Sequence, residues 1–107
     1  MAIHPQGFIS AVENRDNPAT IMIRARDPAH LKTMFPEETV IETPDGDYPV
    51  RLFMERARFA DWLARRAYHL DYTNFKGSIP NDQPTYHDAC VAVWEQMQAL
   101  EKQTRDT

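Results

Sequence analysis

The chain has 107 residues, of which 42% are hydrophobic and 26% are charged, and this is the composition of one ordinary globular domain. Sixteen Asp and Glu outnumber twelve Lys and Arg, and the net charge of −4 disfavours nucleic acid and anionic membranes as partners. The single cysteine cannot form an intramolecular disulfide. No apolar stretch approaches the roughly 20 residues of a membrane span, and the first residues lack a signal-peptide pattern. We therefore expect a cytoplasmic protein with one domain over residues 1–107, frayed at residues 1–6 and 102–107.

The N-terminal quarter of the chain predicts a β-hairpin. Residues 7–14 and 20–26 are rich in β-branched and aromatic side chains, and the polar residues 15–19 connect them. Along the second segment, apolar side chains that suit a buried face of the sheet alternate with side chains that suit a solvent-exposed face. The apolar set is Ile21, Ile23 and Ala25, and the other set is Met22, Arg24 and Arg26.

A short helix and a second pair of strands follow. Asp27 and Pro28 suit the first turn of a helix, because Asp accepts bonds from free N–H groups and Pro is tolerated at the first position. Residues 39–43 and 49–55 then predict two strands. In the connection between them, Gly46 would supply the positive φ angle that a reversal requires.

Two longer helices complete the chain. Apolar side chains at spacings of three and four predict a helix from Arg56 to Tyr72 and a last helix that begins near Gln83 or Thr85. The apolar face of the first of these helices would consist of Phe59, Trp62, Leu63, Ala67 and Leu70. The order of elements is therefore β-β-α-β-β-α-α. This order predicts an α+β fold, in which helices cover one face of a four-stranded, largely antiparallel sheet. The strand order does not follow from the sequence.

The face of the sheet away from the helices is the first candidate site. Arg24, Arg26 and Arg51 would lie there beside Phe53, and some proteins bind single-stranded RNA on an open sheet that shows Arg beside an aromatic. The alternative is a solvated face on which the arginines form ion pairs across the strands. The carboxylates for such pairs would be Glu13, Glu42 and Glu55.

Two further stretches are candidates for binding. Arg65 and Arg66 have two interpretations. They either interact favourably with the dipole at the C-terminal end of their helix or form paired hydrogen bonds with a phosphate or an acidic partner. The stretch Tyr72-Thr73-Asn74-Phe75-Lys76 lies at the joint between the two long helices. Its structural interpretation is a helix end, in which Asn74 caps the helix, Phe75 packs at the edge of the core and Lys76 faces the last carbonyl groups of the helix. Its functional interpretation is a hot spot that anchors a partner.

Catalytic and metal-binding motifs have little support in the sequence. His87 and Cys90 are three residues apart on the last predicted helix, which is near the spacing of metal ligands. However, Cys90 falls on the apolar face of that helix, and there is no CxxC or HxxxH pattern. The three glycines are too far apart for a phosphate-binding loop. We therefore expect no catalytic residue, no metal site and no cofactor, and an enzyme ranks last among the interpretations.

Several short motifs together resemble a known group of proteins. They are Arg24-Ala25-Arg26-Asp27, Asp47-Tyr48-Pro49, Tyr-x-Asn-Phe-Lys at residues 72–76, and Val93-Trp94-x-x-Met97. This set resembles small uncharacterised proteins of actinobacteria, other bacteria and their phages over about residues 8–100, and Tyr-x-Asn-Phe-Lys is its most specific part. The resemblance implies a cytoplasmic setting, is compatible with a phage-encoded role, and transfers no activity.

The leading functional expectation is a protein-interaction module without enzymatic activity. Its partner would be another protein, including a host protein if a phage carries the gene, or a second copy of the chain. The alternative is a binder of a small anionic ligand or nucleotide through surface arginines. The candidate binding residues are Tyr72, Asn74, Phe75, Lys76, Arg24, Arg26, Arg51, Arg65 and Arg66.

Overall fold

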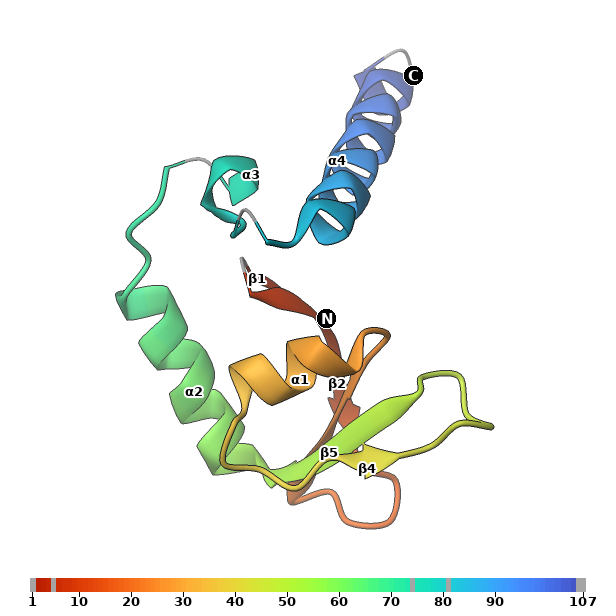
Figure 1. Ribbon diagram of the computed structural model, residues 1–107, viewed down its shortest axis with the longest axis vertical. Coiled ribbons are helices and arrows are strands. Elements are labelled where there is room, and N and C mark those ends of the chain that lie inside the picture. The colour runs from red at the N-terminus through yellow and green to blue at the C-terminus, as the bar shows by residue number, and fades with distance from the viewer. Residues whose placement is uncertain (1, 5, 74, 81, 106–107) are drawn as a thin grey trace. The chain divides into compact units, whose positions relative to one another are not determined.

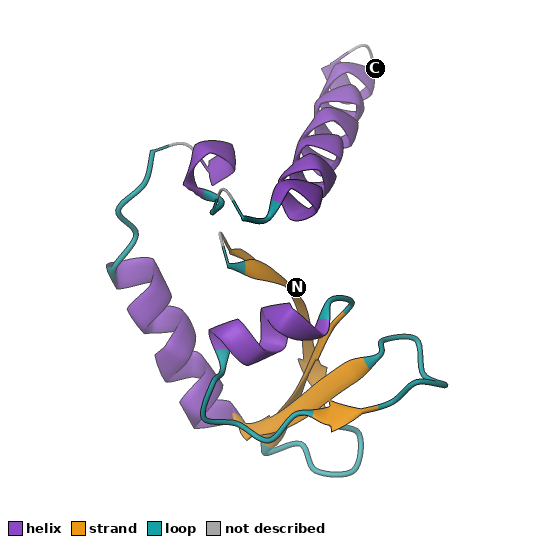
Figure 2. Ribbon diagram, in the orientation of Figure 1, coloured by secondary structure: helices purple, strands orange, loops and turns teal. Residues whose placement is uncertain are grey.

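The computed structural model of the chain describes residues 2–4, 6–73, 75–80 and 82–105. The chain divides into two compact units, Met1–Asp71 and Tyr72–Thr107 (Figure 1). The first unit holds the sheet and two helices, and the second holds two helices (Figure 2).

The elements confirm the α+β class and the predicted order β-β-α-β-β-α-α, to which the structure adds β1 and α3. The first unit contains β1 (Ala2–His4), β2 (Gly7–Glu13), β3 (Thr20–Ala25), α1 (Pro28–Met34), β4 (Ile41–Glu42), β5 (Val50–Glu55) and α2 (Arg56–Tyr68). The second unit contains α3 (Phe75–Ser78) and α4 (Pro84–Arg105).

The sheet is antiparallel, with the strand order β1-β2-β3-β5-β4. Its last four strands form the predicted four-stranded sheet. The N-terminal residues, predicted to be frayed, instead form β1, which pairs with the first residues of β2 and places Ile3 opposite Phe8. The two central strands, β3 and β5, pair along their full lengths and place Ile23 opposite Leu52.

Local capping interactions begin α1 at the predicted position. Asp27 is in an extended conformation, and its carboxylate accepts a hydrogen bond of 2.9 Å from the Ala29 N–H, while Pro28 occupies the first helical position. The buried His30 of α1 accepts a hydrogen bond from the Phe8 N–H through Nδ1. This bond ties α1 to β2.

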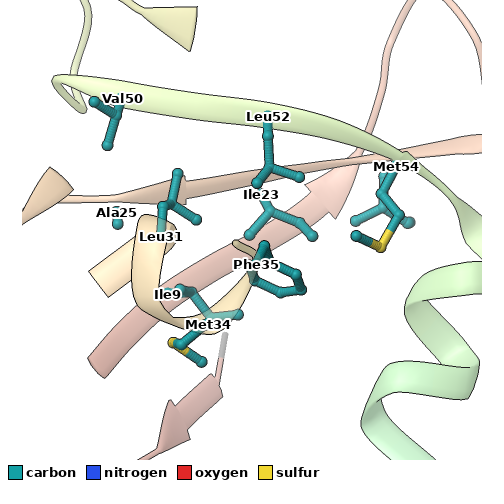
Figure 3. Close-up of a cluster of buried hydrophobic side chains, with 10 residues drawn as sticks. Ile9, Ile23, Ala25, Leu31, Met34, Phe35, Val50, Leu52 and Met54 are labelled. Atoms are coloured by element: carbon teal, nitrogen blue, oxygen red, sulfur yellow. The ribbon is translucent and has the colours of Figure 1, made fainter. Parts of the chain in front are cut away.

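The hydrophobic core of the first unit lies between one face of the sheet and α1 (Figure 3). The alternate residues predicted for the buried face of β3 are all in it, and so are Leu31 and Met34 of α1. Helix α2 adds the partly buried Phe59 and Trp62, and the Trp62 ring lies 4.6 Å from the ring of Phe35. The helices of this unit therefore cover one face of the sheet and leave the other open.

Three features of the first unit differ from the prediction. Strand β4 has two residues instead of five, because only Ile41 and Glu42 pair with β5. Helix α2 ends at Tyr68 rather than Tyr72, and Leu63 on its predicted apolar face is exposed. Gly46 does not have a positive φ, so the reversal between β4 and β5 does not depend on that conformation.

The second unit is built on α4, which begins at Pro84 and continues to Arg105, through residues predicted to be frayed. Ile79, Tyr86 and Cys90 are buried. The apolar face of α4 therefore divides into a buried first part and an exposed later part. The exposed large side chains are Val93, Trp94, Met97 and Leu100. None of the helices in the described part of the chain is long and apolar enough to cross a membrane.

Candidate functional site on the open face of the sheet

The open face of the sheet carries two rows of side chains in register. In the first row Val12 lies opposite Met22, and Met22 lies opposite Phe53. Val12 and Phe53 are 37% and 42% exposed. The second row consists of Ser10, Arg24, Arg51 and Ile41 on four successive strands. An apolar surface thus lies directly beside two arginines.

Arg24 and Arg51 form a like-charged pair across the two central strands, because the register places them opposite each other. Like charges in this position destabilise a sheet. Arg24 donates a hydrogen bond of 3.0 Å from Nη2 to Ser10 Oγ. Arg51 donates from Nε to Thr43 Oγ1 at 3.3 Å and from Nη1 to Met22 Sδ at 3.4 Å.

Arg26 joins this pair through the buried ring of Tyr48. The Cζ atoms of Arg24 and Arg26 lie 4.5 and 4.3 Å from the Tyr48 ring centroid, which is the geometry of a cation–π interaction. Arg26 also donates to the Asp47 carbonyl. The structure therefore brings together the three arginines predicted for the open face. Sequence reasoning did not select Tyr48, although Asp47-Tyr48-Pro49 was one of the motifs that carried the resemblance.

The predicted ion pairs across the strands do not form among the described residues. Glu13 pairs instead with Arg56 at the start of α2, at 2.7 Å. No described carboxylate forms an ion pair with Arg24, Arg26 or Arg51, and the buried Nε of Arg24 has no hydrogen-bond acceptor in the described part of the chain. The arginine cluster, defined as Arg24, Arg26 and Arg51, therefore has no acidic partner there. Comparisons with protein families, with curated proteins and with solved structures found no match.

Arg65 and Arg66 lie apart from this cluster, at a shallow pocket of about 280 Å³ between α2 and the loop after α1. The Arg65 guanidinium pairs with Asp61 at 2.6 Å, and the Arg66 guanidinium lies over the Trp62 ring at 5.1 Å. Arg58 on the same pocket pairs with Glu38. Because two of these three cations already have carboxylate partners, the pocket is a weaker candidate for an anion than the arginine cluster.

The stretch Tyr72-Thr73-Asn74-Phe75-Lys76 belongs to the second unit. It begins after residues 69–71, which separate it from the end of α2, and Phe75 is the first residue of α3. The half-buried Tyr72 and Phe75 pack their rings at 6.2 Å. Asn74 and the side chain of Lys76 lie outside the described residues. The structure thus places the two aromatic side chains together, and Tyr72 lies outside α2, in which it was predicted to be the last residue.

His87 and Cys90, the residues considered for metal binding, both lie on α4. The described residues contain no group of three or more His, Cys, Asp or Glu side chains arranged to hold a metal ion. Burial raises the pKa of the Cys90 thiol, and a hydrogen bond with Tyr86 offsets part of this effect. A raised pKa keeps the thiol protonated at neutral pH, and a protonated thiol is a poor nucleophile.

Proposed function

We propose that this chain is a protein-interaction module that binds its partner with the open face of the sheet. The observation that carries the proposal is the pair of Arg24 and Arg51, which face each other across β3 and β5 with no described carboxylate beside them. Such a pair weakens a sheet that stands alone. It becomes favourable when a partner supplies the negative charge.

The side chains around this pair support a protein partner. Phe53, Val12 and Ile41 are exposed next to the arginines. Aromatic residues, Met and Arg are enriched in protein interfaces, and Arg is common among hot spots. A complementary partner would place an apolar side chain against Phe53 and an acidic side chain against Arg24 or Arg51. The resemblance to phage proteins extends this proposal to a host protein as the partner.

A protein partner also fits this face better than single-stranded nucleic acid. Proteins that bind single strands stack successive bases on several aromatic side chains in a positively charged groove. Here Phe53 is the aromatic side chain in the two rows of the open face, and the chain has a net charge of −4. The arginines are therefore better matched to a local acidic group than to a long polyanion.

The test is capture of partners by the immobilised full chain, with two matched variants. Phe53→Ser and Leu63→Ser each remove a large side chain of nearly equal exposure, 42% and 40%, but only Phe53 lies on the open face. We expect Phe53→Ser to lose the captured protein and Leu63→Ser to retain it. Light scattering on the same proteins reveals whether the partner is a second copy.

Two results would contradict the proposal. One is capture that both variants retain at the native level. The other is binding of a single-stranded oligonucleotide that Phe53→Ser abolishes while no protein is captured. The second result would assign the open face to nucleic acid.

A further inference from the structure

We infer that Arg24, Arg26 and Arg51 form a binding site for an oxyanion, which is a carboxylate or a phosphate group. The inference goes beyond the proposed docking function because it names a ligand chemistry. It also does not depend on that function, since the guanidinium donors are present whatever covers the neighbouring apolar side chains.

The arginine cluster has hydrogen-bond donors that the protein does not fully use. Each guanidinium carries five N–H donors in a planar fork. Arg51 uses one of them on the thioether sulfur of Met22, which is a weak acceptor. The buried Nε of Arg24 finds no acceptor in the described part of the chain. Buried donors without acceptors are uncommon and unfavourable in folded proteins. Arg24 as a whole is only partly buried, and an oxyanion at the accessible part of its guanidinium would compensate the charge that the described residues leave without a carboxylate.

The side chains of the arginine cluster are held in place without a ligand. The Tyr48 ring holds the guanidiniums of Arg24 and Arg26. Thr43 Oγ1 accepts a hydrogen bond from Arg51 Nε and donates one of 2.7 Å to the Tyr48 carbonyl. One hairpin, formed by β4, β5 and their connection, therefore positions all three arginines. Side chains that are already ordered lose less conformational entropy when a ligand binds.

The positive charges of Arg24 and Arg51 also favour an anionic ligand. Arg24 and Arg51 lie directly opposite each other on neighbouring strands, and like charges in this arrangement repel, whereas an oxyanion beside them would attract both. Arg forms paired N–H···O bonds with carboxylate and phosphate oxygens. The same chemistry can come from a free small anion or from an acidic side chain of a protein partner.

The experiment is a thermal-shift titration of the full chain with sodium phosphate and with sodium citrate, against sodium chloride at matched ionic strength. We expect the melting temperature to rise by roughly 5–10 °C at ten times the dissociation constant. Arg24→Gln should lose this shift. Arg66→Gln is the matched control, because Arg66 also lies on an aromatic ring and forms no ion pair with a described carboxylate. It should keep the shift.

A second measurement uses the native chain alone, in case Arg24→Gln does not fold. Nitrogen–proton NMR signals of the arginine Nε–H groups should move saturably on addition of phosphate for Arg24 and Arg51, and remain in place for Arg58. Competition by a Glu-rich peptide then distinguishes the sources. Displacement of phosphate assigns the site to an acidic partner segment, and failure to displace it assigns the site to a free anion. The inference is overturned if neither anion moves these signals, or if Arg24→Gln folds and keeps the full thermal shift.

Discussion

Gly46 and Gly7 differ in what an added methyl group would meet. A Cβ at Gly46 would lie 2.8 Å from Arg51 Nη2, which is the end of a flexible side chain. We expect Gly46→Ala to change the free energy of unfolding by less than about 0.5 kcal/mol while it displaces the Arg51 guanidinium and weakens phosphate binding. Urea denaturation and phosphate titration measure the two effects. Unchanged affinity would show that the connection at Gly46 does not hold Arg51.

Gly7 should behave in the opposite way. A Cβ there would lie 2.5 Å from both Cβ and Cγ of the buried His30, and the His30 Cβ cannot move without the backbone of α1. We expect Gly7→Ala to destabilise the chain by about 1–3 kcal/mol and to leave the affinity of the folded chain for phosphate unchanged. Urea denaturation of this variant beside Gly46→Ala measures the contrast. Equal stability of the two would contradict the packing of α1 on β2.

Cys90 gives the chain a pH dependence at alkaline pH. Burial raises the pKa of its thiol above the value in the unfolded chain, so the native state keeps its proton where the unfolded state has lost it. The contribution to stability is constant below the unfolded pKa, about 8.5, and decreases as the pH rises above it. Urea denaturation between about pH 7 and 10 should show a steeper decline for the native chain than for Cys90→Ala. Identical slopes would contradict the burial of the thiol.

The candidate site was predictable at some residues and not at others. Alternation along one strand was enough to place Arg24 and Arg26 on the open face, because period-2 patterning is local. Tyr48 lies in a connection, where no periodicity reveals its direction. The carboxylate of Glu13 was assigned to the arginines of the sheet, but Arg56, 43 residues away, binds it. Such a competition between side chains is decided by tertiary structure.

Among the elements, the hairpin of β2 and β3 agrees with its prediction more closely than helix α2 does. The hairpin of β2 and β3 was predictable because the β-branched and aromatic side chains of its strands and the polar residues of its connection all favour the same local structure. The spacing of apolar residues continued to Leu70, but α2 ends at Tyr68, and Leu63 is exposed. Helical periodicity shows which residues share a face. It does not show how far along the helix the sheet extends to cover that face.

Helix α2 therefore attaches to the sheet through Trp62 more than through Leu63. Trp62 packs against the rings of Phe35 and Phe59. We expect Trp62→Ala to lower the free energy of unfolding by roughly 2–3 kcal/mol, because it removes a large aromatic contact, and Leu63→Ala to lower it by less than about 0.5 kcal/mol. Urea denaturation measures both. Equal losses would mean that the whole predicted stripe of α2 is buried.

At the scale of the whole molecule, the described core belongs to the first unit. The buried cluster and the partly buried side chains packed against it all lie between Ile9 and Trp62. Length and composition predict one domain, and they do not show how the buried residues group within the chain. We expect a chain that ends at Asp71 to unfold cooperatively and to keep the thermal shift with phosphate. Loss of its folded circular-dichroism spectrum would show that the first unit requires residues 72–107.

The same division separates the two strongest candidate sites. The arginine cluster lies in the first unit, and Tyr72 and Phe75 lie in the second. We propose that the arginines of the open face are present for binding and not for folding. The free energy of unfolding should therefore depend on whether an anion is supplied.

The most direct test is the free energy of unfolding of Arg51→Met, compared with the native chain in chloride and in phosphate. The variant keeps the apolar stem of the side chain and removes one of two facing charges. In chloride we expect it to be more stable than the native chain by about 0.5 kcal/mol, because the repulsion is gone. In phosphate the order should reverse, because only the native chain gains from the anion. A variant that is less stable by the same amount in both buffers would show that Arg51 supports the hairpin and that the open face is not built for an anion.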